Sequence, residues 1–419
     1  MESYHIRGGH KISGECCVKG AKNAALPILA STILSGAECQ LSNIPEITDV
    51  CSMKKILDEL GCKTDTSGET VIVDSRGLMT DTISLERMRE MRSSVFLLGA
   101  LLGRCGSAVI SQPGGCNIGS RPIDLHLYAL KKLGAEIFET EGVILCKASK
   151  LRGADIHFSF PSVGATENAI MAAATAEGHT VLHNCAMEPE ITDLQDFLNA
   201  CGAQISGAGT KTIHIWGRQA LHGCSYRIIP DRIESGTYLA AAAATGGQIT
   251  LQHAQAAHLE SILQKLIETG CEIGVKEDKI YLKAPKRLKP LSRLVTGPYP
   301  AFPTDLQSPF LTMLTQAEGK SAVEETIFEN RFAFTEELRK MGAQITVEGN
   351  RAAVEGIGGL QGCHIQATDL RGGASLVIAG LMAQGETILE GIEHIERGYA
   401  DFSQTLRGLG ADIRKTHGG

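Results

Sequence analysis

The 419-residue sequence has few aromatic residues, no long apolar run and no excess of positive charge. Phe, Trp and Tyr make up 5% of the chain, so its core must consist mainly of aliphatic and alanine side chains. A membrane-spanning helix needs about 20 apolar residues, and the run from Val95 to Gly103 is among the longest present. A net charge of −7 argues against a protein that binds nucleic acid or an anionic membrane. Any anionic ligand must therefore be held by a few local cations.

Several familiar motifs are also missing. There is no G-x-x-x-x-G-K-[ST], and no G-x-G-x-x-G follows a strand-like segment, so classical ATP or dinucleotide binding is not expected. Neither H-E-x-x-H nor clustered His and Cys spacing is present, so no metal site is expected. The 13 cysteines are odd in number, none has C-x-x-C spacing, and the first residues lack an apolar signal core. We expect reduced thiols and a cytoplasmic location.

Glycine, by contrast, is abundant and periodic. Six glycines, each between a helix-like segment and a β-type run, recur 68 to 73 residues apart. Each is typical of a residue that ends a helix in the left-handed conformation and begins a strand. They are Gly61, Gly134, Gly202, Gly270, Gly342 and Gly410. The sequence therefore consists of six repeats of about 70 residues.

A second series of glycines lies upstream of the first in each repeat. Its members are Gly36, Gly106, Gly178, Gly247, Gly319 and Gly385. The segments before them are apolar nearly all round, which predicts six buried inner helices. The segments before the first series are amphipathic, which predicts outer helices. Each repeat is expected to run strand, inner helix, strand, outer helix and further strands.

The starts of the inner helices carry an unusual number of cations. The residues at these positions are Lys22, Arg92, Gly164, Arg232, Asp305 and Arg371. A cation faces the positive end of the helix dipole there and is normally unfavourable. Four of them at equivalent positions indicate a shared anion-binding site. The alternative is that each is merely a solvated residue of the first helical turn.

The segment Gln112–Pro122 departs most from the repeat pattern. It is a glycine-rich loop that carries Cys116, with Arg121 after it and Arg104 before it. Neighbouring cations lower the pKa of a thiol and make it a reactive thiolate or a tuned proton donor. Alternatively, Cys116 is a small core side chain, as expected for most of the other twelve cysteines.

Two aspartates and two further arginines are additional candidates. Asp305 and Asp369 could each be a helix N-cap, or a base that removes a proton from a hydroxyl nucleophile. Arg331 and Arg397 occupy corresponding positions in the fifth and sixth repeats. The alternative for both arginines is an ion pair on a solvated loop.

Together these segments resemble the enolpyruvyl transferases, and among them the UDP-N-acetylglucosamine 1-carboxyvinyltransferase family. The resemblance covers essentially the whole chain, and the cysteine loop is its most specific part. It is carried by Lys22–Pro27, Arg92–Ser94, Pro113–His126, Pro161–Asn168, Pro230–Thr237, Phe302–Asp305, Phe328–Phe332, Asp369–Arg371 and His394–Tyr399.

The resemblance implies an α/β fold of two domains, each an inside-out α/β barrel of three repeats, with buried inner helices and outward-facing sheets. Residues 21–229 would form the first domain, which carries the Cys116 loop. Residues 1–20 and 230–419 would form the second, and substrates would bind between the domains.

The implied reaction transfers the enolpyruvyl group of phosphoenolpyruvate to the 3′-hydroxyl of UDP-N-acetylglucosamine and releases phosphate. By resemblance, Cys116 is the acid near C3, a site of covalent adducts and the target of the antibiotic fosfomycin, and Asp305 takes the hydroxyl proton. No cofactor or metal is implied. The implied phosphoenolpyruvate site comprises Lys22, Asn23, Arg121, Arg331, Arg371 and Arg397. The implied nucleotide-sugar site comprises Arg92, Arg121, Pro122, Ile123, Asp124, Leu125, Pro161, Ser162, Val163, Gly164, Asp305 and Ile327.

Three rival functions stay open from the sequence. The shikimate-pathway enolpyruvyl transferase shares the implied fold but lacks the cysteine loop. A non-catalytic repeat scaffold would leave the loop and the cations without a purpose. A thiol hydrolase that uses Cys116 would need a histidine partner, and none adjoins the loop. The oligomeric state cannot be inferred from the sequence.

Overall fold

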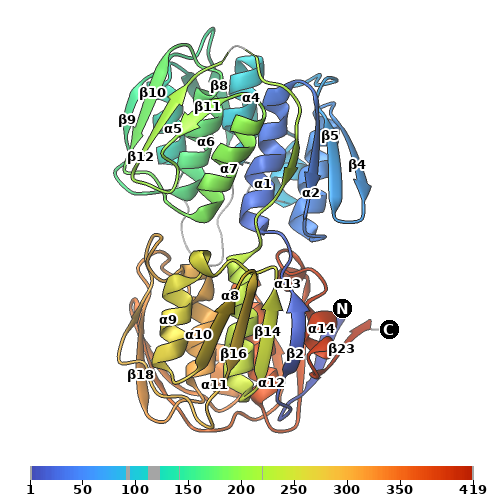
Figure 1. The fold of residues 1–419 in the computed structure, drawn as a ribbon, viewed down its shortest axis with the longest axis vertical. Coiled ribbons are helices and arrows are strands. Elements are labelled where there is room, and N and C mark those ends of the chain that lie inside the picture. Colours follow the sequence, from blue (N-terminus) through green and yellow to red (C-terminus); the bar gives the residue numbers. More distant parts are fainter. Residues whose placement is uncertain (1, 91–94, 112–122, 141, 219, 418–419) are drawn as a thin grey trace. The chain divides into compact units, whose positions relative to one another are not determined.

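A computed structural model describes residues 2–90, 95–111, 123–140, 142–218 and 220–417. The chain divides into two compact units (Figure 1). The described residues of the first unit lie within 20–229, and those of the second unit are 2–19 and 230–417. None of the described helices combines the length and the apolar character needed to cross a lipid bilayer.

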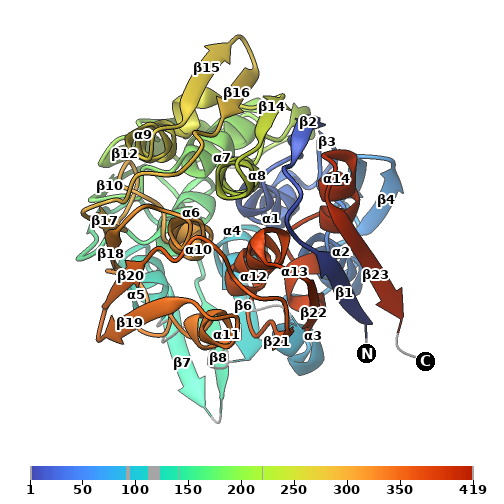
Figure 2. The ribbon, with the colours of Figure 1, turned by 90° about the horizontal axis from the view of Figure 1, so that it is seen from below.

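Six inner helices are buried on nearly every side, as their all-round apolar sequences predicted. They are α1 (Lys22–Ser31), α4 (Leu97–Cys105) and α6 (Val163–Ala173) in the first unit, and α8 (Arg232–Thr245), α10 (Gln307–Leu314) and α12 (Leu370–Met382) in the second. In the first unit α4 packs on α1 and α6. In the second unit α8, α10 and α12 pack on one another, and Figure 2 shows them nearly end-on with strands around them.

The outer helices bury only one face, which confirms their amphipathic pattern. In α9, for example, Ile262, Leu263 and Leu266 are buried, whereas Ile267 is exposed. The outer helices are α2 (Thr48–Glu59), α5 (Asp124–Lys132), α7 (Pro189–Ala200), α9 (Glu260–Glu268), α11 (Thr335–Lys340) and α14 (Phe402–Gly408). Two additional helices are α3 (Leu85–Glu90) and α13 (Glu393–Glu396).

The described residues of each unit form three sheets. Those of the first unit run β13(Ser225–Arg227)-β3(Glu38–Ser42)-β5(Thr70–Asp74)-β4(Lys63–Ser67), β6(Ser107–Ser111)-β8(Val143–Lys147)-β7(Glu136–Thr140) and β11(Gln204–Ser206)-β12(Thr212–Trp216)-β10(His179–His183)-β9(Asp155–His157). The second of these has three strands within the described part of the chain. An isolated bridge between Thr82 and Val109 stands where the other repeats have their opening strand.

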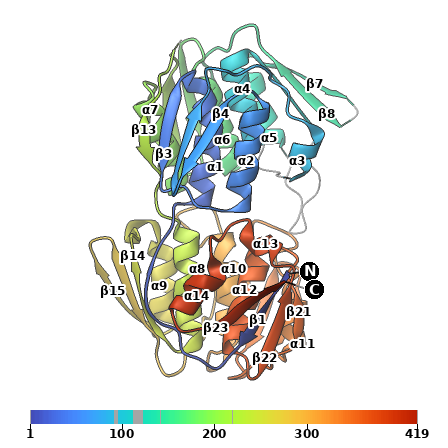
Figure 3. The same ribbon diagram turned by 90° about the vertical axis from the view of Figure 1, so that its right-hand side faces the viewer.

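The three sheets of the second unit have four strands each. They run β15(Glu272–Lys276)-β16(Lys279–Lys283)-β14(Gln248–Gln252)-β2(Ser13–Cys17), β17(Leu294–Val295)-β18(Lys320–Glu324)-β20(Arg351–Glu355)-β19(Gln344–Glu348) and β21(His364–Gln366)-β22(Glu386–Glu390)-β1(Glu2–Arg7)-β23(Asp412–His417). Figure 3 shows β1 and β23 side by side, and their pairing is antiparallel.

The opening strands of the first and fourth repeats are exchanged between the units. Strand β2 opens the first repeat but pairs in parallel with β14 of the fourth. Strand β13 opens the fourth repeat but pairs in parallel with β3 of the first. The pairing of β2 with β14, together with that of β1 with β22 and β23, places residues 2–19 in the second unit.

The first series of glycines adopts the predicted left-handed conformation, and the second series ends the inner-helix segments with one exception. All six of the first series have φ between 91° and 98°. In the second series the prediction is wrong by one residue in the fourth repeat, because Gly246, with φ of 67°, ends α8. Gly247 is required for another reason: a Cβ there would lie 2.0 Å from the carbonyl oxygen of Ile12.

Candidate active site

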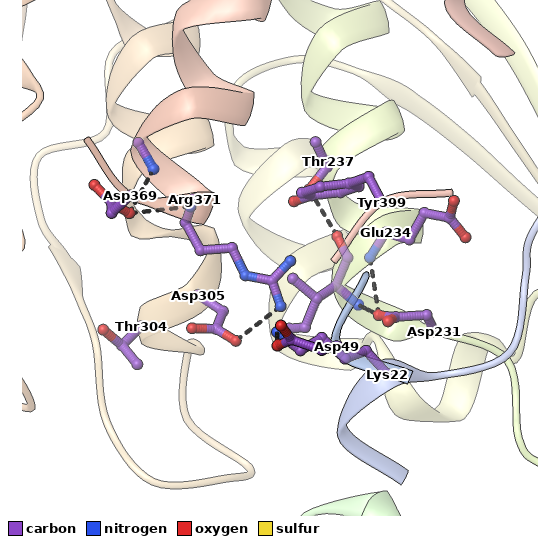
Figure 4. A network of polar contacts seen from close by, with 12 residues as sticks. Lys22, Asp49, Asp231, Glu234, Thr237, Thr304, Asp305, Asp369, Arg371 and Tyr399 are labelled. Carbon is purple, nitrogen blue, oxygen red and sulfur yellow. Dashed lines mark hydrogen bonds and ion pairs between the residues drawn. The ribbon is translucent and has the colours of Figure 1, made fainter. Parts of the chain in front are cut away.

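A carboxylate held by two buried guanidinium groups is the central feature of the second unit. Asp305 lies in η4 (Thr304–Leu306), the 3-10 turn before α10. Its Oδ1 accepts a hydrogen bond from Arg331 Nη2 at 2.6 Å and its Oδ2 accepts one from Arg371 Nη2 at 3.1 Å (Figure 4 shows the latter). The arginine side chains are 3% and 5% exposed, against 25% for Asp305. The carboxylate thus carries a stabilised negative charge and still reaches solvent.

This arrangement bears on one of the two roles considered for Asp305, that of a helix N-cap. The N-cap residue of α10 is Leu306, and that of η4 is Pro303. The N-cap alternative is therefore wrong for Asp305. Its oxygens accept hydrogen bonds from Arg331 and Arg371 instead.

Arg331 is positioned by the segment that contains Ile327. Its Nε and Nη2 each donate to the carbonyl oxygen of Thr304 at 3.2 Å. The Thr304 hydroxyl donates to Glu325 Oε2, and Glu325 Oε1 accepts from the backbone N–H of Ile327 at 2.7 Å. Arg331 and Glu325 are both buried. The solvated-loop alternative is thus wrong for Arg331.

Arg371 is positioned by the start of α12. Asp369 is the N-cap of this helix, and its Oδ1 accepts from the backbone N–H groups of Arg371 and Gly372 at 3.0 and 2.9 Å (Figure 4). For Asp369 the N-cap alternative is therefore confirmed. The cap fixes the first helical turn, from which the Arg371 side chain reaches Asp305.

The Arg371 guanidinium also packs against an aromatic ring. Its central carbon lies 5.3 Å from the centroid of Tyr399, and the Tyr399 hydroxyl shares a 2.8 Å hydrogen bond with Thr237. Burial by itself lowers the pKa of Arg371. The charge of Asp305, together with the interactions of Tyr399 and Asp231, outweighs burial and raises that pKa above its usual value. Arg371 is thus a permanent cation in a buried setting.

The start of α8 holds a third buried arginine and a buried glutamate. Asp231 caps the helix through its Oδ1, which accepts from the N–H groups of Ile233 and Glu234 (Figure 4). Arg232 is 7% exposed and lies 5.6 Å from the ring centroid of Tyr299. The solvated first-turn alternative is therefore wrong for Arg232. Burial raises the pKa of the Glu234 carboxyl to about 8.

In the first unit the predicted cation Lys22 is the first residue of α1. Its Nζ forms a 2.6 Å ion pair with Asp49 Oδ2, and the two side chains are 11% and 3% exposed. The sequence analysis missed Asp49, although a signal exists. The run Glu46-Ile47-Thr48-Asp49 recurs as Glu190-Ile191-Thr192-Asp193 in the third repeat, and both aspartates are 2% exposed.

The predicted nucleotide-sugar segment around Gly164 packs against a buried histidine, His126. Asn168 Nδ2 lies 2.8 Å from His126 Nδ1, and Asn168 Oδ1 accepts from the backbone N–H of Gly99 at 2.7 Å. Burial lowers the pKa of His126 to about 4, so the ring is neutral near pH 7. A Cβ on Gly164 would lie 2.8 Å from His126 Cε1. The sequence analysis did not single out His126 or Asn168 for this role.

The other predicted residues divide into two groups. Half-buried positions in the described part of the chain are Asn23, Ile123, Leu125, Pro161, Ser162, Val163, Ile327 and Arg397, and Asp124 is exposed. Arg92, Cys116, Arg121 and Pro122 lie outside the described residues. The structure therefore brings together Asp305, Arg331 and Arg371 in one unit, and pairs Lys22 with Asp49 in the other.

Comparisons with known proteins give one consistent result. The family model described as EPSP synthase (3-phosphoshikimate 1-carboxyvinyltransferase) matches residues 6–406. A UDP-N-acetylglucosamine 1-carboxyvinyltransferase 2 from Caldanaerobacter subterraneus is 53% identical over 413 residues, with 99% of both chains covered. A UDP-N-acetylglucosamine 1-carboxyvinyltransferase from Geotalea uraniireducens is 46% identical, again over 99% of both chains.

Solved structures agree on the fold. The enolpyruvyl transferase NikO from Streptomyces tendae matches with a TM-score of 0.90 and 26% identity, covering 100% of this chain and 99% of that one. EPSP synthase from Acinetobacter baumannii matches with a TM-score of 0.76 and 19% identity, covering 100% of both chains. The mixed α/β fold of the chain is thus that of these transferases.

Proposed function

The chain belongs to the UDP-N-acetylglucosamine 1-carboxyvinyltransferases, within the wider EPSP synthase family, and we propose that it transfers the enolpyruvyl group of phosphoenolpyruvate to the 3′-hydroxyl of UDP-N-acetylglucosamine. Phosphate is released, and the product is committed to peptidoglycan synthesis. The observation that carries the proposal is the Asp305 carboxylate between Arg331 and Arg371. This set combines a proton acceptor with fixed positive charge, and the reaction needs both.

The proposed chemistry is an addition followed by an elimination. Asp305 takes the proton of the 3′-hydroxyl as its oxygen forms a bond to C2 of phosphoenolpyruvate, while Cys116 supplies a proton to C3. The C2–O bond to phosphate then breaks and C3 loses a proton. The double bond between C2 and C3 re-forms in the enolpyruvyl group, which is now attached to the 3′-oxygen of the sugar. Because the hydroxyl proton must go to a base within hydrogen-bond reach, the partly exposed Asp305 oxygens suit this role.

The proposed cations bind the anionic groups of phosphoenolpyruvate. We assign phosphate and carboxylate binding to Lys22, Arg121 and Arg397, with Arg331 and Arg371 next to the reacting base. Arg331 and Arg371 are already in contact with Asp305, so an incoming anion competes with that carboxylate for them. Such competition would loosen Asp305 and make it a better base when substrate is bound.

The finer features of fold and location are part of the same proposal. We propose that each unit is an inside-out barrel of three repeats, which is supported by the six buried helices and the six sheets. A cytoplasmic location is supported by the cysteines, because the twelve in the described part of the chain are all free thiols.

One rival keeps specific support. The matching family model is described by the shikimate 3-phosphate reaction. Against it, the solved EPSP synthase is 19% identical to this chain, whereas the UDP-N-acetylglucosamine enzymes are 46–53% identical. A repeat scaffold without activity does not account for a buried ion-pair network centred on a partly exposed carboxylate.

Phosphate release from phosphoenolpyruvate tests the proposal. The full-length chain is incubated with no acceptor, with UDP-N-acetylglucosamine, or with shikimate 3-phosphate. We expect release only with the nucleotide sugar, together with a product that carries the enolpyruvyl group by mass spectrometry. Folded Asp305→Asn protein controls for contaminating phosphatases. Release only with shikimate 3-phosphate would establish the rival, and no release with either acceptor would overturn both.

A further inference from the structure

Three cysteines from distant parts of the sequence meet inside the first unit. Cys39 lies in β3, Cys201 directly follows α7, and Cys224 directly precedes β13. The Sγ atoms of Cys201 and Cys224 are 3.4 Å apart, and all three Sγ atoms lie within 4.8 Å of one another. Cys39 and Cys201 are buried, while Cys224 is half-buried and gives the cluster a route to solvent. We call these three residues the thiol cluster.

The backbone around the thiol cluster is held by hydrogen bonds. The N–H of Gln40, next to Cys39, donates to the carbonyl oxygen of Cys224 at 2.9 Å. The carbonyl oxygen of Cys201 accepts from the N–H of His222, also at 2.9 Å. The three sulfur atoms therefore converge from fixed elements, and no loop has to rearrange to bring them together.

We propose that the thiol cluster binds one thiophilic d¹⁰ cation, Zn²⁺ in the cell. Zinc–sulfur bonds of about 2.3 Å place the sulfurs of a tetrahedral site about 3.8 Å apart. The observed separations, from 3.4 Å to within 4.8 Å, bracket that value, so binding needs only small side-chain shifts. Three thiolates leave a fourth position open on the side of Cys224. The thiols release their protons to solvent as the metal–sulfur bonds form.

Such a site would stabilise the first unit. It would link β3, near the start of the unit, to α7 and β13, near its end, in the same way that structural zinc sites join distant segments. The alternative is that the three thiols are only small core side chains that happen to adjoin.

A second group of possible ligands lies on the surface of the same unit and must be separated experimentally. Asp155 Oδ1 lies 2.8 Å from His157 Nε2 and 3.2 Å from His183 Nε2. This group offers nitrogen and oxygen rather than sulfur, and all three side chains reach solvent. Metal bound there would not give a thiolate-to-metal charge-transfer band.

Cadmium titration of the reduced full-length chain tests the proposal. Cd²⁺ is the probe, because its thiolate complexes absorb in the ultraviolet. We expect one equivalent to bind tightly with that band and to raise the unfolding temperature. Cys201→Ser and the half-buried Cys224→Ser should each lower the cadmium affinity at least about 100-fold and weaken the band. Excess Zn²⁺ should compete with Cd²⁺ for the wild-type chain and lower the apparent cadmium affinity, because thiolates bind the softer Cd²⁺ more tightly.

Matched variants make the result decisive. Cys185→Ser removes a thiol of the same unit that is as buried as Cys201 and lies outside the cluster, so it should keep wild-type binding. His183→Gln should also keep the charge-transfer band. Phosphate release from phosphoenolpyruvate checks that each variant is folded. A band that keeps its wild-type intensity and cadmium affinity in both cluster variants, or a band that never forms, would overturn the proposal. The proposal would also be overturned if Cys201 and Cys224 formed a disulfide in air and the reduced chain bound no cadmium. That result would identify the two cysteines as a redox pair.

Discussion

Asp305 and Arg371 belong to neighbouring repeats and meet in an ion pair of 3.1 Å, with the arginine side chain 5% exposed. In the proposed reaction Asp305 is the proton acceptor, and Arg371 supplies a cation that burial does not neutralise. One contact therefore provides two things. In the substrate-free protein it stabilises the negative charge of Asp305, and it holds a cation that an incoming anion can also bind.

Replacing the carboxylate with an amide separates these two requirements. In Asp305→Asn the base is lost, but the charge that competes for Arg331 and Arg371 is lost as well. We expect kcat to fall by about 10²- to 10⁴-fold, while the KM for phosphoenolpyruvate stays equal or decreases. Steady-state kinetics measures both parameters. Asp305→Glu is the matched control and should retain more turnover than Asp305→Asn. Wild-type kcat in Asp305→Asn would remove this residue from the chemistry.

Glu234 makes the stability of the second unit dependent on pH. Burial raises the pKa of its carboxyl from the usual 4.5 to about 8, so the folded state holds the proton more tightly than the unfolded state. Between these two values the folded state binds more protons, and stability must fall as pH rises. We expect Glu234→Gln to remove this slope, which is on the order of 1 kcal/mol per pH unit.

Urea unfolding measures this slope. It is carried out at several pH values between about 5 and 8.5, which cover most of the interval between the unfolded and folded pKa values of Glu234. In Glu234→Gln the amide oxygen of the new side chain would still accept from the backbone N–H of Lys19, as the carboxylate does at 2.9 Å. Glu272→Gln, on the exposed edge of β15, is the control and should keep the wild-type slope. Burial also raises the pKa of Asp193, to about 7, but that group is the same in all the variants. Equal slopes in wild type and Glu234→Gln would contradict the prediction.

Gly164 has no room for a side chain. A Cβ there would lie 2.8 Å from His126 Cε1 and 3.3 Å from Phe96 Cε1, and His126 is 7% exposed and bonded to Asn168. We expect Gly164→Ala to destabilise the protein by about 1–3 kcal/mol and to raise the KM for UDP-N-acetylglucosamine. Denaturant unfolding and kinetics measure the two effects.

Gly408→Ala is the control for a glycine with open space around it. No atom lies within 4 Å of its added Cβ, and alanine in the last turn of α14 should stabilise the helix by about 0.5 kcal/mol. If the two alanine variants had the same stability, steric crowding at Gly164 would not be the cause.

Cys116 is expected to be the thiol that fosfomycin alkylates. The resemblance to the family implies fosfomycin as the reagent, and the glycine-rich setting of Cys116, with Arg121 five residues away, favours a reactive thiol. We expect one modified site, with faster labelling when UDP-N-acetylglucosamine is bound, since a filled site raises the effective molarity. Cys116→Asp should escape labelling and keep some turnover, whereas Cys116→Ala should lose most turnover.

Peptide mapping after fosfomycin treatment locates the label. The exposed cysteines Cys17, Cys51 and Cys105 are the internal comparison, because exposure outside the implied anion-binding site should give slower alkylation. Cys51→Ser should be labelled like the wild type. Label on any of these three, or inhibition of the native enzyme without label, would refute the assignment.

Local patterns in the sequence were enough to predict the repeats. Six periodic glycines, six apolar segments and six amphipathic segments predicted the order of elements. The described residues follow this order except that the second repeat has an isolated bridge in place of its opening strand and the sixth has one strand after its outer helix. The exchange of β2 and β13 between the units could not be inferred from the repeat pattern. That pattern shows where a strand lies in the chain, but it does not show which other strand it pairs with. The one-residue error at Gly246 and Gly247 has a similar origin, since either glycine can end a helix and only the nearby Ile12 backbone distinguishes them.

The sequence by itself determined which residues are chemically able to act: Asp305, Arg331 and Arg371 were all singled out by position and residue type. Only the tertiary structure decided that Asp305 pairs with both arginines while Asp369 caps a helix, although both aspartates precede inner helices. It also decided that Lys22 meets Asp49 and that Cys39, Cys201 and Cys224 form one cluster. The reason is physical. Helix periodicity and turn chemistry act over a few residues and leave a pattern in the sequence, whereas ion pairs and thiol contacts between repeats depend on how separate helices and sheets pack.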